Sequence, residues 1–396
     1  MLLRAVLLAI GAGHVQAGTD GAMPHYFEQQ LVPGTAEELR QCGLPTAIDV
    51  AGKLFPAALK VFPLAHRGKS TGTGHFKEVH KWLIALLALG IPLMIVFDNP
   101  TARYPPKAVE HTKRAAAAKI ARDKAVAYDA DPALEEQAKA DKEWSKVPHR
   151  ETLTDLMQFT AQLCTALKIR WVVAPFEADQ QCAYASHARQ AGAVWPPHGD
   201  SDLPLYGIDT VLFRMNQNNG NHSRLSVFNL LGRVVDAKPA PPDAPPKKVD
   251  LRAVNSIAAL ADIVILGGCD YFKQPGVAVP TAHKHMARHD FDFDTYVQVE
   301  LGEDLSTPAG RKSESGVQLL AARATFAYPL AWRCEWGDDG MPSSATLTHG
   351  TARGAAAPDG GLAGLMKVLG ITPAVAKRLR DPSNALALAR GCACVC

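Results

Sequence analysis

The chain is 396 residues long and 47% hydrophobic, which is enough to build the core of one large domain or of more than one. Its formal net charge of +3 is only mildly basic, so it permits nucleic-acid binding without arguing for it. The eight cysteines form no CxxC pair and no zinc-ligand spacing, and no run of about 20 apolar residues occurs. We therefore expect no zinc centre, no membrane span and a reducing compartment.

The first 22 residues differ from the rest of the chain. Arg4 is followed by an apolar stretch, a pattern that weak secretory or organellar signals also have. We interpret residues 1–22 as an N-terminal extension or a mispredicted start, with Met23 as the counterpart start. A targeting segment remains the alternative.

Four short apolar runs are predicted to be fully buried parallel strands, at residues 44–49, 91–98, 171–174 and 263–268. Carboxylates stand at or soon after the ends of such runs, and each one alone is also typical of a strand stop or a helix N-cap. In an open α/β sheet, ligands bind beyond the carboxyl ends of the strands, so these acids are expected to face one crevice. The acids are Asp49, Asp98, Glu177, Asp179, Asp200, Asp202 and Asp270.

Acids gathered in one crevice repel one another unless cations join them. Mg²⁺ and Mn²⁺ prefer oxygen ligands and keep several waters, which suits a site that must admit phosphate. Two such ions about 4 Å apart can orient a water and stabilise both oxygens of an in-line displacement. The pattern thus predicts a two-metal phosphodiesterase centre. Glu177 is expected at the entry of a helix, with Asp179 in its first turn.

Residues 105–150 are predicted to be a charged helical insertion, with an Ala-rich helix over residues 108–128. Lys107 precedes this helix and Arg114 lies within it, where they are candidates for neutralising phosphate charge. For the more distant cations of the helix, a solvated face with i,i+4 pairing is the expectation. These cations are Lys113, Lys119, Arg122 and Lys124.

Beyond the predicted sheet, the chain changes composition. Residues 236–248 carry Pro-Pro repeats and are expected to be a stiff linker without regular structure. Residues 249–300 bring Asp270 and a Gly/Pro-rich segment at 275–280, and residues 301–396 are mixed, with Gly/Ala/Ser-rich stretches.

The motifs at residues 173–181, 199–207 and 266–271 resemble the internal motifs of flap-endonuclease-like (XPG-type) structure-specific nucleases, and their wording is closest to the exonuclease-one branch. Residues 46–49 and 95–98 resemble the strands that carry the first two metal-site aspartates of that family. The resemblance runs from about residue 23 to the C-terminus and thins after about residue 286. It implies an α/β, PIN-like 5′-nuclease fold with a mostly parallel central sheet flanked by helices.

The family pattern also implies a division of the chain. Residues 23–235 would hold the N-terminal and internal nuclease regions, with a helical arch at 105–150. Residues 249–300 would hold the last metal-site acid and a helix-two-turn-helix-like DNA-binding segment, and residues 301–396 a divergent end of the catalytic domain.

Site roles follow from the same resemblance, residue by residue. All seven acids named above would bind two Mg²⁺ ions, for which Mn²⁺ can substitute, and Lys107 and Arg114 would reach the scissile phosphate. Phe55 stands where the family stacks a ring on the terminal base, although core filling in the first helix is an equal alternative.

The segment at residues 275–280 matches the family's hairpin, which binds duplex phosphates with the help of a K⁺ ion. Gly276 keeps the first glycine of its pattern, and Ala278 replaces the second. Alanine would be strained there if the position needs a positive φ.

The expected function is that of a Mg²⁺-dependent, exonuclease-like 5′ nuclease that acts on DNA with free or flapped 5′ ends, including nicks and gaps. We expect it in DNA repair, recombination or replication, in the nucleus, or in the mitochondrion or another organelle if residues 1–22 are a targeting segment. A flap endonuclease or an RNA-directed nuclease of the same fold is the second hypothesis. A non-catalytic DNA-structure-binding subunit is the third, against which the seven intact acids argue. The identity of any protein partner stays open.

Overall fold

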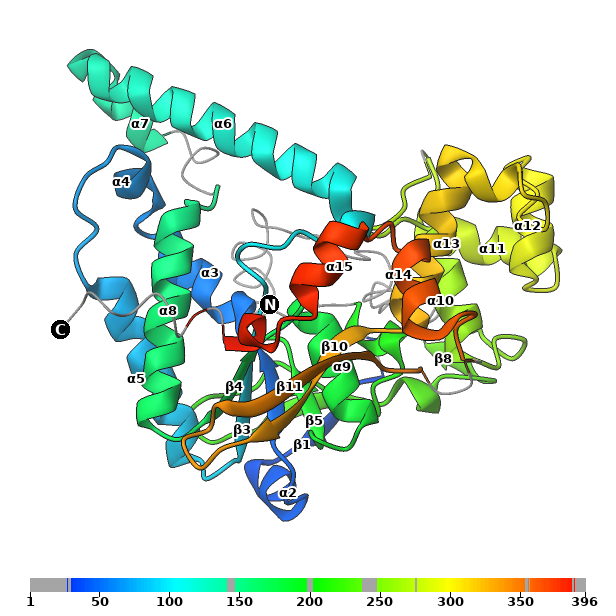
Figure 1. The fold of residues 1–396 in the computed structure, drawn as a ribbon, viewed down its shortest axis with the longest axis horizontal. Helices are drawn as coiled ribbons and strands as arrows, with labels where there is room; N and C mark the ends of the chain where they lie inside the picture. Colours follow the sequence, from blue (N-terminus) through cyan, green and yellow to red (C-terminus); the bar gives the residue numbers. More distant parts are fainter. Residues whose placement is uncertain are drawn as a thin grey trace, which may run out of the picture.

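A seven-stranded sheet forms the centre of the computed structural model, which describes residues 27, 30–140, 147–197, 202–236, 248–274, 276–352, 355, 357–386 and 388 (Figure 1). Its strand order is β1-β7-β6-β5-β2-β3-β4. The strands from β6 to β4 in this order run parallel, and β7 is antiparallel to both β6 and β1. The predicted mostly parallel sheet is therefore confirmed. The strands are β1 Val32–Gly34, β2 Thr46–Asp49, β3 Leu93–Phe97, β4 Arg170–Val173, β5 Ala193–Trp195, β6 Val211–Phe213 and β7 His222–Leu225.

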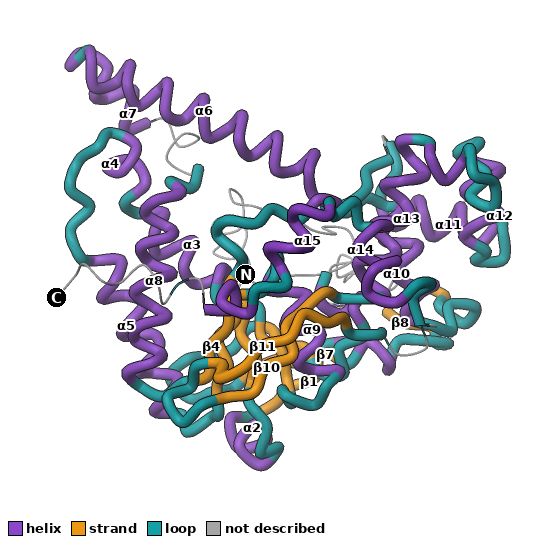
Figure 2. Tube along the Cα trace, in the orientation of Figure 1, coloured by secondary structure: helices purple, strands orange, loops and turns teal. Residues whose placement is uncertain are grey.

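Strand β3 is apolar and buried along its whole length, and Ala47 and Ile48 of β2 are buried as well, because helices cover both faces of the sheet (Figure 2). Successive side chains point to opposite faces. Ile48 and Ile95, which pair across β2 and β3, pack with helices α3 Ala51–Leu59, α5 Gly74–Ala88 and α8 Arg150–Ala166. Ala47 and Val96 face the other layer, which contains α9 Ala178–His187, α10 Ile257–Leu266 and α13 Glu314–Ala327.

The remaining elements surround this layered core. Two of them, β8 and β9, pair antiparallel, as do β10 and β11. They are β8 Val234–Asp236, β9 Lys248–Asp250, β10 Leu330–Trp336, β11 Pro342–His349, α2 Ala36–Gln41, α4 Phe62–His66, α6 Ala108–Ala130, α7 Glu135–Ala140, α11 Val279–Arg288, α12 Phe293–Glu300, α14 Gly361–Val368 and α15 Pro373–Leu379.

The predicted Ala-rich helix is present as α6, which crosses above the body of the molecule with α7 folded against its far end (Figure 1). That end has a small apolar cluster of its own, in which Ala121, Ala125 and Tyr128 pack with Ala138 of α7. Ion pairs of Asp129 with Arg67 and Lys69, at 3.5 and 3.0 Å, tie it to the loop after α4.

The strand predicted at residues 263–268 is wrong. These residues belong to the end of helix α10 and the turn after it, and every residue of α10 from Leu260 to Leu266 is buried. A short apolar run is ambiguous because a strand covered on both faces and a helix buried all round have no polar side that would show a period.

Two glycines after α10 bring the chain round to Asp270. A Cβ atom on Gly267 would lie 2.5 Å from the Cα atom of Val279. The backbones at the end of α10 and the start of α11 are therefore too close for a side chain at position 267. Gly268 has a φ of +100°, which L side chains rarely adopt. The positive-φ requirement considered for Ala278 does not arise: its φ of −105° and ψ of 163° are extended, whereas Gly276 has a φ of +76°.

The predicted linker at 236–248 is bounded by paired strands. Asp236 ends β8 and Lys248 begins β9, and these two residues pair with each other. Both ends of the predicted linker therefore have regular structure. Residues 237–247 lie outside the described residues, as do residues 1–26 and Asp200.

Candidate active site

Acids lie at or soon after the carboxyl ends of four adjacent parallel strands, of which β2, β3 and β4 were predicted and β5 was not. Asp49 ends β2, and Asp98 directly follows β3. The loop after β4 leads to Glu177 and Asp179, and Asp202 comes after β5. Because the strand order is β5-β2-β3-β4, these side chains start from one edge of the sheet. Asp270 reaches the same region from the turn after α10.

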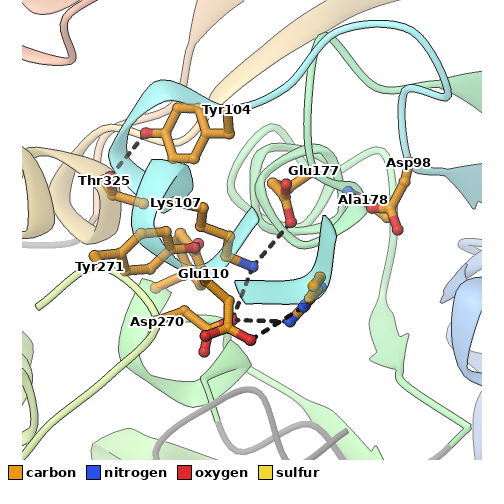
Figure 3. Close-up of polar contacts among 11 residues, drawn as sticks. Asp98, Tyr104, Lys107, Glu110, Glu177, Ala178, Asp270, Tyr271 and Thr325 are labelled. Carbon is orange, nitrogen blue, oxygen red and sulfur yellow. Dashed lines mark hydrogen bonds and ion pairs between the residues drawn. The ribbon is translucent and has the colours of Figure 1, made fainter. Parts of the chain in front are cut away.

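Asp98 joins the end of β3 to the start of α9. Its Oδ1 accepts a hydrogen bond of 2.7 Å from the backbone N–H of Ala178 (Figure 3). Glu177 occupies the N-cap position of α9 and Asp179 its first turn, as predicted. The positive end of the helix dipole thus faces acids, which it favours. Burial, followed by the charge of Glu177, raises the pKa of Asp98 to about 6.

Lys107 lies among these acids with its ammonium buried. Its Nζ is 2.9 Å from Oε2 of Glu177 and 3.4 Å from Oδ2 of Asp270, and it sits 5.3 Å from the ring centre of Tyr271 (Figure 3). Burial alone would lower the pKa of Lys107, but Glu177, Asp270 and Asp179 raise it well above its usual range. The lysine therefore stays charged.

Arg114 approaches the same carboxylate from α6. Its Nη2 is 3.6 Å from Oδ2 of Asp270, and its Nε donates to Glu110 at 3.1 Å. The two basic residues predicted from the sequence are thus brought together with two of the predicted acids, Glu177 and Asp270.

Tyrosines that sequence reasoning gave no role pack beside this cluster. The hydroxyls of Tyr271 and Tyr206 lie 3.0 Å apart, and the hydroxyl of Tyr104 is 2.7 Å from Oγ1 of Thr325. Tyr206 and Tyr271 belong to the quoted motifs, so proximity to the acids was a usable signal. Nothing in the sequence pairs Tyr104 with Thr325, which lies on α13.

Two buried glutamines of helix α9, for which no role was predicted, form hydrogen bonds to the backbone of strand β10. Gln181 accepts from the backbone N–H of Trp332 at 2.7 Å and donates to its carbonyl at 2.9 Å, while Gln180 accepts from Leu330 N–H at 2.9 Å. These side-chain amides thus bond to backbone groups of β10 that a neighbouring strand would otherwise pair with. The hairpin β10–β11 therefore supports the helix that carries Asp179.

The donor set fits a hard divalent cation, because it consists of carboxylate oxygens whose mutual repulsion such an ion would relieve. Within the part of the chain that the structure describes, no three His, Cys, Asp or Glu side chains are grouped so as to hold an ion as they stand. Lys107 takes up two of the predicted ligands, and a third, Asp200, lies outside the described residues.

The three predicted DNA contacts lie on other elements than this cluster. Phe55 is half-buried on α3, where its ring meets that of Phe62 edge-to-face at 5.7 Å. Gly276 and Ala278 lie in the turn before α11, a helix that stands well apart from α3 in Figure 1.

The sequence of the region just described is similar to that of a known family. Residues 168–270 match the XPG I-region. This segment contains Glu177, Asp179, Asp200, Asp202 and Asp270, so the resemblance predicted from its motifs is confirmed.

Two curated plant proteins are similar over a longer stretch. Exonuclease 1 of Arabidopsis thaliana is 27% identical over 272 residues, which covers 67% of this chain and 32% of that protein. Exonuclease 1 of Oryza sativa subsp. japonica is 25% identical over 270 residues, with 67% and 29% covered. The chain thus spans about a third of the length of the curated relatives it matches.

Among solved structures, the chain is similar to the catalytic core of Rad2 in complex with DNA substrate. The TM-score is 0.44 at 16% identity, and the match covers 72% of this chain and 74% of that one. Flap endonuclease-1 from Methanococcus jannaschii gives a TM-score of 0.42 at 18% identity, covering 91% and 98%. Among the described residues, none of the helices is both long and apolar enough to cross a membrane.

Proposed function

We propose that this protein is a metal-dependent 5′ nuclease that hydrolyses phosphodiester bonds of DNA with free or flapped 5′ ends, in the manner of a 5′-to-3′ exonuclease. The observation that carries the proposal is the meeting of Glu177 and Asp270 with Lys107 and Arg114, inside and beside the XPG I-region match. The name of the two plant relatives, Exonuclease 1, supports the exonuclease reading.

Seven acids would hold two Mg²⁺ ions, or Mn²⁺ in their place: Asp49, Asp98, Glu177, Asp179, Asp200, Asp202 and Asp270. When bound, such ions supply Lewis acidity and neutralise phosphate charge. Asp98 keeps the start of α9 against the end of β3, which fixes where Glu177 and Asp179 leave the backbone.

Cationic side chains would hold the substrate. Lys107 and Arg114 donate to the oxygens of the scissile phosphate and stabilise the charge that builds up on them. Phe55 stacks on the terminal base, and the turn with Gly276 and Ala278 binds duplex phosphates, together with a K⁺ ion. The setting would be DNA repair, recombination or replication in the nucleus, or in an organelle if residues 1–22 direct the protein there.

A flap endonuclease or an RNA-directed nuclease would use the same acids, and a DNA-structure-binding subunit would use none of them for chemistry. The deciding experiment is cleavage of labelled duplexes that carry a recessed 5′ end, a 5′ flap or an RNA strand, in Mg²⁺. We compare the wild type with Asp202→Asn, which removes one buried predicted ligand, and with Asp209→Asn, a change at an exposed acid nearby.

We expect a ladder of products from the 5′ end with the wild type and Asp209→Asn, and a loss of at least about 100-fold in rate with Asp202→Asn. A single cut at the flap junction would show that the protein is a flap endonuclease. Cleavage of the RNA strand alone would show that it is an RNA-directed nuclease. Binding of folded protein to DNA without any metal-dependent cleavage would overturn the catalytic proposal.

A further inference from the structure

Lys107 combines deep burial with contacts to two carboxylates of the proposed metal centre. Its side chain is 8% exposed, and those of its partners Glu177 and Asp270 are 18% and 3% exposed. A lysine is expensive to bury and is retained in such a place only where opposite charges compensate it. Its ammonium therefore does at this site what a bound cation does: it balances acids that would otherwise repel.

A divalent ion and the ammonium need the same space. Mg²⁺ binds carboxylate oxygens at about 2.0–2.1 Å. The Nζ of Lys107 already stands 2.9 Å from Oε2 of Glu177 and 3.4 Å from Oδ2 of Asp270. An ion on those oxygens, facing Lys107, would come within contact distance of the ammonium and repel it.

We propose that Lys107 is an internal counter-ion of this site, which a divalent cation displaces from Glu177 and Asp270 when it binds. The inference rests on the proposed metal centre and adds to it a second position of the Lys107 side chain, away from the two carboxylates. The ion and the ammonium bind these carboxylates in alternation, so the lysine becomes free to meet a phosphate only once the ion is in place.

The local structure lets the side chain move without the backbone. Pro105 and Pro106 precede Lys107 in a short 3₁₀ turn, and α6 begins directly after it, so the main chain is restrained on both sides. The flexible four-carbon stem of lysine can swing within that frame. Arg114 is 41% exposed and lies at the longer distance of 3.6 Å from Asp270. We therefore expect a bound ion to displace it less than Lys107.

The first test measures whether Lys107 becomes accessible. The wild-type protein, without DNA, is treated at pH 8 with an amine-acylating reagent in EDTA or in Mn²⁺, and the labelling rate of each lysine is read by mass spectrometry. Lys119, exposed on α6, serves as the internal control. We expect Mn²⁺ to raise the labelling rate of Lys107 on the order of tenfold and to leave that of Lys119 unchanged.

The second test measures competition. Free Mn²⁺ is followed by electron paramagnetic resonance during titration of the wild type, Lys107→Met and Arg114→Gln. Both variants lose one positive charge next to Asp270, but only Lys107 stands between the two carboxylates. Displacement predicts that Lys107→Met lowers the Mn²⁺ dissociation constant on the order of tenfold, well beyond the effect of Arg114→Gln.

The outcomes separate this inference from the function beneath it. If the wild type and both variants bind no Mn²⁺, the metal centre itself is refuted. If the wild type binds Mn²⁺ but the labelling rate of Lys107 does not change, the centre stands and the displacement is refuted. The same conclusion follows if the two variants tighten binding equally, since loss of charge alone would then explain both. Should Lys107→Met fail to fold, the labelling of the wild type decides.

Discussion

Arg114 differs from Lys107 in how much water it keeps. Its side chain is 41% exposed against 8% for the lysine, although both contact Asp270. An exposed guanidinium retains donors that a phosphate can use without any rearrangement of the protein, and its planar fork suits phosphate oxygens. Of the two cations, Arg114 is the one we expect to add to binding of DNA even before a metal ion is present.

We predict that Arg114→Gln weakens binding of a 5′-flap duplex and lowers the slope of log affinity against log salt by about 1, because one phosphate contact is lost. Lys119→Gln on the same helix should leave the slope unchanged, since Lys119 is exposed and paired with Asp123 at 2.6 Å. Fluorescence anisotropy in Ca²⁺ over a series of KCl concentrations measures both. Equal slopes for the two variants would show that α6 acts only through its total charge.

At this scale the sequence reveals residue types but not their partners. Asp98 could be assigned to the site from its place after an apolar run, yet the same place is typical of a cap. In the structure, Asp98 accepts a hydrogen bond from the backbone N–H of Ala178 and so caps a helix that starts 80 residues later in the chain. Neither motif nor spacing carries that information, because the contact depends on which strands become neighbours.

Helix α9 and the hairpin β10–β11 form the next larger unit of the site. The helix presents Asp179 on the side of the acids and Gln181 on the side of the hairpin, and all of its residues from Ala178 to Ala185 are buried. The hydrogen bonds of Gln181 replace those that a neighbouring strand would make to Trp332. The stability of this unit therefore depends on a side chain that has no chemical role.

We predict that Gln181→Leu lowers the free energy of unfolding by about 2–4 kcal/mol, because it leaves the buried N–H and C=O groups of Trp332 without their partner. Gln298→Leu, at an exposed position of α12, is the matched control and should change stability by less than about 0.5 kcal/mol. Urea unfolding followed by circular dichroism gives both values. A stable Gln181→Leu protein would mean that the hairpin docks by apolar contacts alone.

The elements themselves were predictable to different degrees. Strands β2, β3 and β4 and helix α6 follow from short apolar runs and from an Ala-rich charged pattern. Helix α10 did not, because its apolar residues continue around its whole circumference. The hairpin β10–β11 was also missed, since only Pro342 and Leu347 of β11 are buried and the strand lacks the regular alternation of apolar and polar residues that predicts a strand.

For the molecule as a whole, the clustered acids are a source of instability. Asp98 and Glu177 are like charges in a partly buried site, and sheet, helices and hairpin all have to hold them together. Proteins commonly retain such strain because the site requires it, at a cost in stability.

We therefore predict that Asp98→Asn is more stable than the wild type in EDTA at pH 8, on the order of 1 kcal/mol, while nuclease activity in Mg²⁺ is lost. The amide oxygen can still accept from Ala178 N–H, so only the charge is removed. Since the pKa of Asp98 is raised to about 6, its favourable contribution is present at low pH and lost as the pH rises through 6. The advantage of the variant should thus shrink at pH 5.

Thermal unfolding at both pH values, with Asp209→Asn as the exposed control, checks this expectation. An Asp98→Asn protein that is less stable than the wild type at pH 8 would show that the carboxylate is compensated in ways other than those seen here.

The chain order of the site also governs when it can exist. The first acid stands at Asp49 and the last at Asp270, and the strands β2, β3, β4 and β5 between them pair through parallel, long-range contacts. Such pairing is slow to form and cannot be completed by a partial chain. A polypeptide still emerging from the ribosome would have exposed the acids of β2 and β3 long before Asp270 arrives. The proposed centre would therefore be complete only after Asp270 has been synthesised, and a nascent chain that ends before this residue would have no nuclease activity.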